Sequence, residues 1–534
     1  MPQVAEQVID DAAFESERVS RFAGRVQDLA SRLTEWQDHL PIVFIVAMYV
    51  SYFTRMSMDV HRGLGSSGYD FGLYDQGLWL LSRFKAPYVT IMGRNLMGDH
   101  TSFILVLLVP LYWIAPGAWI LLFSQSAAIG CGAFVVYALA RRKIGGVALP
   151  TLLGALYLAH PALSWTNMEQ FHPDAYLGLL LPLALYGALC RRTRLFVVAT
   201  ALCLLVKEDT VLIVAPLGVW VAWRRDRRLG LWVVAAAVGY ALFATQFVLR
   251  SLIGRPTLNS WRIPFGGPSG SVRTLIDQPG QVFEYLKADH RPFYVWQMLL
   301  PYVPAFVWAP DVAAISIVVL VSNVVSTFVY QHLVQYHYSL VVVPAMAMAT
   351  VMGIARLGGR RRTIVVSLVV VLTSWSAHLW SVLPGSRNVY AHWPANHPVP
   401  MEVRELARYL PPNAVVSATH NFVPQIDYRD RIYQFPTPFS ARLWGVYDRE
   451  GQQLPFIGDI QYVFITNDLL DLQPIWDRYK DQFEPYVQGR YATIYVRKGL
   501  AHSPSRPIPD GVGPPTGSTA PTGSTATGST ALDP

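Results

Sequence analysis

The chain contains 534 residues, of which 52% are hydrophobic and 15% are charged, and its mean hydropathy is +0.29. These values exclude an ordinary soluble protein, because a soluble fold would have to bury more apolar sequence than its core can hold. The formal net charge is +8, but the basic residues cluster at the ends of apolar runs, which argues against a nucleic-acid partner. The composition therefore predicts a polytopic α-helical membrane protein that contacts membrane lipid and binds no nucleic acid.

Four short basic segments determine the predicted topology. They are residues 140–143 (ARRK), 191–194 (RRTR), 224–228 (RRDRR) and 356–362 (RLGGRRR). The positive-inside rule assigns such loops to the cytoplasm. Residues 1–39 are hydrophilic and rich in arginine, so they predict a cytoplasmic lead-in before the first apolar run. With these segments inside, residues 40–383 form a transmembrane domain of about eleven spans.

The first apolar run, residues 40–54, predicts an outward span, and a large outer loop follows over residues 59–116. The segment HTSFILVLLVPLYWI, residues 100–114, is short for a helix that must cross about 30 Å of hydrocarbon. Counting it as a span would also put the basic residues 141–143 on the outer side. We therefore expect an interfacial or re-entrant helix at this place in the loop.

Within the same loop, residues 73–83 predict a short amphipathic helix at the membrane surface. Asp75, Gln76 and Trp79 share one face of that helix, beside an apolar stripe. Asp70 precedes Asp75 by five residues, a displacement of about 140° around a helix axis, so the two carboxylates are not expected to act as a pair. Asp75 is either a functional carboxylate or a solvated or capping residue of a surface helix.

The same topology assigns four further polar segments to the outer side: residues 99–100 (DH), 164–174 (SWTNMEQFHPD), 207–209 (KED) and 331–338 (QHLVQYHY). Ionisable groups at the membrane edge are costly and usually mark a function. Polar clusters that are distant in sequence but share one face therefore predict one cavity. Its candidate substrate-binding residues are Asp70, Gln76, Trp79, His100, Glu169, His172, Lys207, Glu208 and His337.

Two of these segments place a histidine beside or near a carboxylate. Asp99 and His100 are the candidate metal ligands, and a hard divalent cation suits them better than zinc, because the spacing is not that of a zinc-binding helix. A hydrogen-bonded loop histidine is the alternative. Lys207 lies between two apolar runs, so it should be paired or bind an anion. Pairing with Glu208 or Asp209 and binding of a phosphate both remain open.

The pattern changes after the last predicted span. Residues 384–498 alternate short apolar runs, such as AVVSAT and IQYVFIT, with amphipathic stretches such as MEVRELARYL and LQPIWDRYKDQF. This alternation predicts a small α/β domain outside the membrane. Residues 499–534 contain a repeat of Gly, Ser, Thr and Pro that cannot pack a core, which predicts a disordered tail.

The order of several motifs resembles the GT-C glycosyltransferases, polytopic enzymes that use polyprenyl-phosphate sugars. These motifs are an outer-loop aspartate after the first span, an apolar helix opened by a histidine, a span ending in ARRK, and a lysine-containing break between two short spans. More closely, DFGLYDQGLW, GDHTSFILVLLVPLY, EQFHPDAY and KEDT are similar to the bacterial membrane family known as domain of unknown function 2079. The likeness extends over about residues 40–498.

The resemblance implies an inverting glycosyltransferase of the bacterial cytoplasmic membrane. It would move a sugar from a polyprenyl-phosphate donor to an envelope glycan, lipid or protein on the outer side. Asp75 matches the first-loop aspartate that acts as the catalytic base in such enzymes, and Lys207 stands where related transferases have a lysine near the lipid phosphate. His100 or His172 would donate on the phosphate side, and Trp79 would form an apolar wall for sugar or lipid.

The chain departs from the common pattern of the transferases in one place, because Asp75 is followed by Gln76 instead of a glutamate. An acidic-pair mechanism, and a metal held by such a pair, therefore lack support, and the cofactor is undetermined beyond a possible divalent cation. A transporter or flippase for lipid or lipid-linked sugar is the main alternative function. It commonly shows internal repeats and polar sites near the bilayer midplane. A scaffold of an envelope complex is a further alternative.

Overall fold

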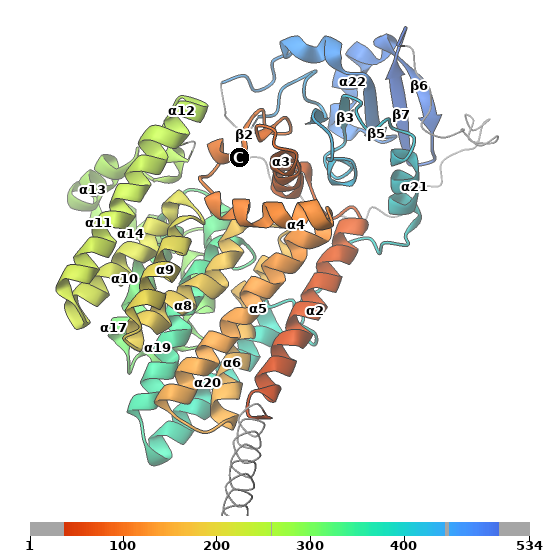
Figure 1. Cartoon of the computed structure of the whole chain (residues 1–534). Coiled ribbons are helices and arrows are strands. Elements are labelled where there is room, and N and C mark those ends of the chain that lie inside the picture. The colour runs from red at the N-terminus through yellow and green to blue at the C-terminus, as the bar shows by residue number, and fades with distance from the viewer. Residues whose placement is uncertain (1–36, 258, 444–447, 501–534) are drawn as a thin grey trace, which may run out of the picture.

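The computed structural model describes residues 37–257, 259–443 and 448–500. Figure 1 shows a bundle of helices with a smaller body, built around a β-sheet, over one end of it. Most of the predicted cytoplasmic lead-in and of the predicted disordered tail lies outside the described residues.

Five helices among the described residues are long and apolar enough to cross a bilayer. They are α2 (Leu40–Arg62), α5 (Ala118–Lys143), α11 with its continuation (Arg227–Ile253), η10 (His337–Val342) with α19 (Val343–Arg356), and α20 (Gly359–Trp380). Helix α2 carries a proline in its first turn. The backbone N–H groups of a first turn have no partner within the helix, so the proline costs no hydrogen bond there. The helix continues past the predicted end at residue 54, so Asp59 belongs to the helix and not to the loop.

The other predicted crossings fall on shorter helices. Their bounds are α6 (Ala148–Leu158), α7 (Pro161–Met168), η4 (Pro173–Tyr176) with α8 (Leu177–Leu189), α9 (Thr193–Leu204), η5 (Glu208–Thr210) with α10 (Val211–Arg224), and α17 (Pro310–Ala313), η8 (Ala314–Ser316) and α18 (Ile317–Val325). A helix of 11 residues such as α6 is about 16 Å long, roughly half the hydrocarbon thickness. Helix length therefore supports five complete spans and does not establish eleven.

Ion pairs distinguish the two ends of the bundle. Arg141, in the last turn of α5, has its Nη2 3.0 Å from Oδ2 of Asp38, just before α2. Near the other end of α2, Asp59 has its Oδ2 3.0 Å from Nε2 of His392, which leads into the sheet body. Arg224 and Arg356, at the ends of α10 and α19, both pair with Asp311. We call the end with Asp38 and Arg141 the basic end, and the other end the sheet end.

The first loop covers the sheet end with a layer of short elements. They are η1 (Gly68–Gly72), α3 (Leu73–Ser82), β1 (Tyr88–Val89), β2 (Arg94–Asn95), η2 (Leu96–Gly98), η3 (Phe103–Leu108) and α4 (Val109–Ile114). The segment expected to be interfacial or re-entrant thus divides into η3 and α4. Figure 1 shows α4 lying crosswise to α2 and α5 instead of alongside them.

A second group of short helices connects α12 (Arg250–Ile253) to the last spans. It comprises η7 (Ser260–Arg262), α13 (Pro268–Asp277), α14 (Pro279–Lys287), α15 (Arg291–Leu299), α16 (Val303–Phe306) and η9 (Val329–His332). Arg291 is buried at the start of α15, where its guanidinium donates to the carbonyl oxygens of Val324 and Ser326 and pairs with Asp289. This arginine ties the connection to the end of α18.

The sheet body contains five strands in the order β4-β3-β5-β7-β6. Their bounds are β3 (Val416–Ala418), β4 (Ile432–Gln434), β5 (Tyr462–Thr466), β6 (Phe483–Gln488) and β7 (Ala492–Arg497), with helices α21 (Pro398–Ala407) and α22 (Gln473–Tyr479). Strands β4 and β5 run parallel to β3, whereas β7 is antiparallel to both β5 and β6. Central strand β5 is buried along most of its length, as its apolar sequence requires.

Candidate functional site

Asp70 brings an accessible carboxylate to the sheet end of the bundle. It lies in η1, where its backbone N donates to Oγ of Ser67 at 3.1 Å, and Gln170 Nε2 lies 3.5 Å from its Oδ2. Asp70 is exposed, and burial together with the charge of Asp70 raises the pKa of Glu169 well above its usual range. The first loop and the segment after α7 therefore meet at Asp70.

The turn between α7 and η4 directs two candidate residues toward one point. Gln170 has a φ of 61°, in the left-handed region that reverses the chain sharply. Gln125 of α5 holds this turn, because its Nε2 donates to the Gln170 carbonyl at 2.7 Å and its Oε1 accepts from the backbone N of His172 at 2.9 Å. Glu169 and His172 are thus positioned by a spanning helix.

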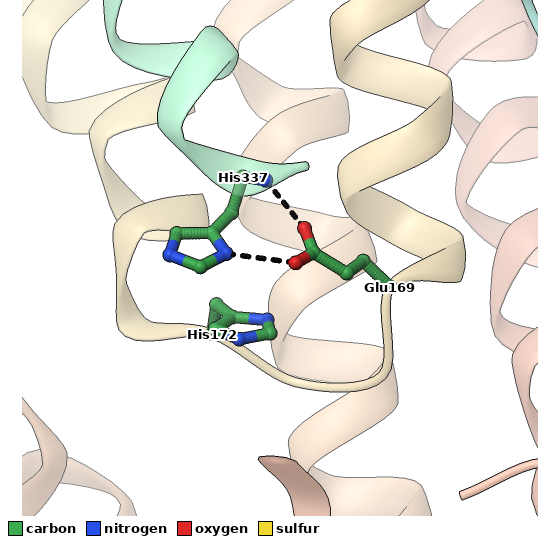
Figure 2. Close-up of side chains that lie close together, drawn as sticks. All are labelled: Glu169, His172 and His337. Atoms are coloured by element: carbon green, nitrogen blue, oxygen red, sulfur yellow. Dashed lines mark hydrogen bonds and ion pairs between the residues drawn. The ribbon is translucent and has the colours of Figure 1, made fainter. Parts of the chain in front are cut away.

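Figure 2 shows Glu169, His172 and His337 side by side. Oε1 of Glu169 lies 3.0 Å from Nδ1 of His337, and its Oε2 accepts from the backbone N of the same histidine. The two imidazole rings stack with centroids 3.8 Å apart and an interplanar angle of 16°. We call these three residues the histidine cluster.

Lys207 is buried next to this cluster. Its extended backbone separates α9 from η5, which leaves the side chain at the sheet end. The ammonium Nζ lies 3.7 Å from Asp174 and 3.6 Å from Asp209, and 5.5 Å above the ring of Tyr338. The carboxylates overcome burial and raise the pKa of Lys207, so this lysine, only 3% exposed, keeps its positive charge. Of the two neutralising partners left open by the sequence, Asp209 pairs with Lys207.

Glu208 has different partners from those of Lys207. Its Oε1 lies 2.7 Å from Nδ1 of His100, and Oε2 accepts from the backbone N of Thr101 at 3.0 Å. Burial opposes this ionisation, but the His100 partner lowers the pKa of Glu208 to about 2. The adjacent Asp99 pairs instead with Arg94, which outweighs burial and lowers the pKa of Asp99 to about 2. Asp99 and His100, the predicted metal candidates, therefore belong to two separate ion pairs.

Asp75 faces a different environment from that of Asp70. Its Oδ1 accepts from the hydroxyls of Tyr112 at 2.6 Å and Tyr428 at 3.1 Å, and the residue is 2% exposed. Burial raises the pKa of Asp75 to about 6 against these hydrogen bonds. The neighbouring Asp427, also buried, has its pKa raised by burial and by the charge of Asp75. Among the described residues, no member of the histidine cluster hydrogen-bonds to Asp75.

Gln76 and Trp79 also face the sheet body. Gln76 is fully buried, and its Nε2 donates to Thr90 Oγ1 and to the Arg429 carbonyl, each at 3.1 Å. Trp79 stacks on Tyr428 with an interplanar angle of 6° and centroids 6.2 Å apart. The predicted helix is present as α3, but Asp75 and Gln76 are buried toward the sheet body instead of forming an exposed polar face.

The structure thus divides the predicted residues between two places. Asp70, His100, Glu169, His172, Lys207, Glu208 and His337 gather at the sheet end, whereas Asp75, Gln76 and Trp79 form contacts with the sheet body. Sequence reasoning missed Asp174 as a partner of Lys207 and missed Arg94, Tyr112, Asp427 and Tyr428. The run IDYRDR was the available signal for the last two, since it is unusually polar between the apolar strands.

Solved structures that match this fold include two of one protein. The crystal structure of ArnT from Cupriavidus metallidurans bound to undecaprenyl phosphate matches with a TM-score of 0.53 and 14% identity, covering 86% of this chain and 99% of that one. The apo structure of the same protein matches with a TM-score of 0.50 and 13% identity, covering 86% and 98%. The chain therefore shares the fold of ArnT.

Comparison with the curated proteins found no match. Residues 60–501 match the family described as predicted membrane protein (DUF2079). This match includes the first loop, four of the five helices long and apolar enough to cross a bilayer, and the sheet body. The chain is therefore a membrane protein that belongs to the DUF2079 family.

Proposed function

We propose that this protein is a GT-C glycosyltransferase that moves a sugar from a polyprenyl-phosphate donor to an acceptor of the bacterial cell envelope. One observation carries the proposal: within a fold shared with an undecaprenyl-phosphate-bound protein, an accessible carboxylate and a buried, charged lysine come together at one end of the bundle. Transfer from a lipid phosphate needs both groups, one for the acceptor proton and one for the leaving phosphate.

The reaction would be a single displacement. The acceptor hydroxyl attacks the anomeric carbon, the bond from that carbon to the phosphate oxygen breaks, and polyprenyl phosphate leaves with the bonding electrons. A carboxylate takes the hydroxyl proton, and attack from the face opposite the phosphate inverts the anomeric centre. Lys207 and a protonated His100 would stabilise the charge that develops on the phosphate, since the Glu208 partner overcomes burial and the charge of Lys207 and raises the pKa of His100.

Geometry favours Asp70 over Asp75 as the base. A general base must reach the proton of a bound hydroxyl, directly or through one water. Asp70 is exposed beside Gln170, whereas both tyrosine hydroxyls already donate to one oxygen of the buried Asp75. We assign Asp70 the role that the family resemblance gave to Asp75.

The two ends of the bundle support a proposed orientation. The positive-inside rule favours a cytoplasmic basic end, and the sheet end and its polar residues would then lie on the outer side of the cytoplasmic membrane. A lipid-linked sugar would reach Lys207 from the membrane, and an envelope glycan, lipid or protein would approach from outside. The sheet body contacts the first loop through Gln76 and Thr90, and in this proposal it would limit the size of the acceptor.

Release of free polyprenyl phosphate tests the proposal. Purified protein in detergent is incubated with a panel of undecaprenyl-phosphate sugars and a membrane glycan extract, and wild type is compared with Asp70→Asn and Asp75→Asn. We expect turnover by wild type, a loss of at least about 100-fold in Asp70→Asn, and at least a tenth of wild-type turnover in Asp75→Asn.

Comparison of Asp70→Asn with Asp75→Asn tests the identity of the base separately from the transferase function. Loss in Asp75→Asn with activity kept in Asp70→Asn would restore Asp75 as the base while leaving the transferase proposal intact. Absence of turnover by folded wild type with every donor, together with measurable binding of undecaprenyl phosphate, would refute the transferase and favour a lipid carrier.

A further inference from the structure

The histidine cluster brings metal-binding side chains together from two segments far apart in the sequence. Glu169 and His172 come from the turn after α7, and His337 comes from the start of η10 (Figure 2). Each residue offers one ligand atom, and these atoms all lie within 4.8 Å of one another. Ligands bound to one zinc ion are separated by roughly 3.3–3.5 Å, so side-chain shifts of about an ångström would close the site.

An unsatisfied atom points to a ligand at this place. His172 Nδ1 is buried and has no hydrogen-bond partner among the described residues. Buried polar atoms in folded proteins are almost always paired with protein, water or an ion. The backbone of His172 is held by Gln125, and its ring is stacked on His337, so the orphaned nitrogen remains within the cluster.

Groups around the cluster resemble the outer shell of a metal site. Oδ2 of Asp174 lies 4.0 Å from Nε2 of His337, close enough to accept its proton after a small approach. A histidine that donates one ring N–H to a carboxylate presents its other nitrogen to a metal in the correct tautomer. The backbone N of His337 donates to Oε2 of Glu169, which leaves Oε1 directed at His337 Nδ1.

Carboxyl groups lie within and beside the histidine cluster. Glu169, Asp174 and Asp209 contribute carboxyl groups at this place, whereas Lys207 is the cation that pairs with two of them. A divalent ion bound by Glu169 would leave Lys207 with both of its carboxylate partners.

We propose that Glu169, His172 and His337 bind a divalent transition-metal ion, for which Zn²⁺ is the best-matched probe. Two imidazoles and one carboxylate form a donor set that zinc and other first-row metals accept, and three protein ligands leave one position open to water or to an oxygen ligand. The ion would also join the turn after α7 to the start of η10. This site differs from the Asp99 and His100 pair expected from the sequence, and it does not depend on the transfer reaction.

Zinc binding by the purified full-length protein tests this site. Protein in detergent is stripped with a chelator, and Zn²⁺ alone is titrated in competition with a chromogenic zinc indicator. We expect one Zn²⁺ per chain in wild type, and binding weaker by about tenfold or more in Glu169→Gln, His172→Gln and His337→Gln. The exposed His290 provides the matched control, so His290→Gln should bind zinc like wild type.

Two further measurements keep the test decisive if a variant does not fold. His172→Asp exchanges one ligand type for another and should retain a one-to-one stoichiometry. Wild type loaded with Cu²⁺ should show hyperfine coupling from two imidazole nitrogens in its electron paramagnetic resonance spectrum. Absence of stoichiometric Zn²⁺ binding, binding unchanged in all three glutamine variants, or a Cu²⁺ spectrum without two imidazole nitrogens would overturn the proposal. The metal-binding experiments contain no sugar donor. A negative result in the transferase assay would therefore not change their outcome.

Discussion

Asp70 and Asp75 lie on adjoining elements but face different surroundings. Successive residues of a helix point about 100° apart, so α3 can direct Tyr74 toward the ring of His172 while Asp75 points to Tyr112 and the sheet body. Asp70 precedes this helix and remains accessible. A separation of five residues thus decides which carboxylate remains accessible.

The buried Asp75 should make stability depend on pH. Its pKa is raised to about 6 by burial, above an unfolded value of about 4, so the folded state binds the proton more tightly. Its stabilising contribution is fully present below pH 4 and is lost as pH rises through 6. Asp75→Asn removes this titration. Between pH 4.5 and 7.5 the stability of the variant should therefore improve relative to wild type by about 2 kcal/mol.

Thermal unfolding in detergent across this pH range measures the effect. Asp468 is exposed in the sheet body, so Asp468→Asn serves as the control and should follow wild type. Parallel pH curves for wild type and Asp75→Asn would contradict the assignment of a raised pKa to Asp75.

At the scale of elements, small residues allow neighbouring helices to pack closely. In α5, a Cβ added at Gly132 would lie 2.1 Å from the Gly178 carbonyl oxygen of α8 and 2.8 Å from the Tyr157 ring of α6. Tyr157 also donates to the same carbonyl at 2.7 Å. Three helices therefore meet where only a hydrogen atom fits, in the manner of membrane interfaces built on small residues.

Gly132→Ala should force α5 and α8 apart and lower the free energy of unfolding by about 1–3 kcal/mol, as overpacking commonly does. Gly239 in α11 has no atom within 4 Å of its added Cβ, so Gly239→Ala should be neutral or stabilising by up to about 1 kcal/mol. Thermal unfolding of the two variants in the same detergent compares them directly. Equal changes in the stability of both variants would contradict the prediction that the close contact between α5 and α8 requires glycine at position 132.

The whole molecule has two chemically different ends, and their sides of the membrane can be tested. Arg192 is exposed after α8, in one of the predicted cytoplasmic loops, and Asp468 is exposed in the sheet body. In a background where Cys131, Cys190 and Cys203 are replaced, we expect an impermeant maleimide to label Asp468→Cys in intact cells. Arg192→Cys should react only after permeabilisation. The reverse pattern would invert the proposed orientation and move the site to the cytoplasmic side.

By itself, the sequence determined the features that depend on local composition. Apolar length predicted helical spans, and α3, expected over residues 73–83, is observed at Leu73–Ser82. The family assignment also followed from the motifs DFGLYDQGLW and EQFHPDAY and is confirmed by the match over residues 60–501. The basic runs predicted which short loops face the cytoplasm. The helix lengths do not establish the predicted number of spans.

Only the tertiary structure decided which polar residues meet. Periodicity placed Asp75 on a polar face, but it could not show that the sheet body, more than 300 residues later, covers that face through Tyr428. The pairing of Lys207 with Asp174, and of Glu169 with His337, likewise depends on contacts between distant segments. Burial, and with it the protonation of each carboxylate, is set by such contacts and leaves no local pattern in the sequence.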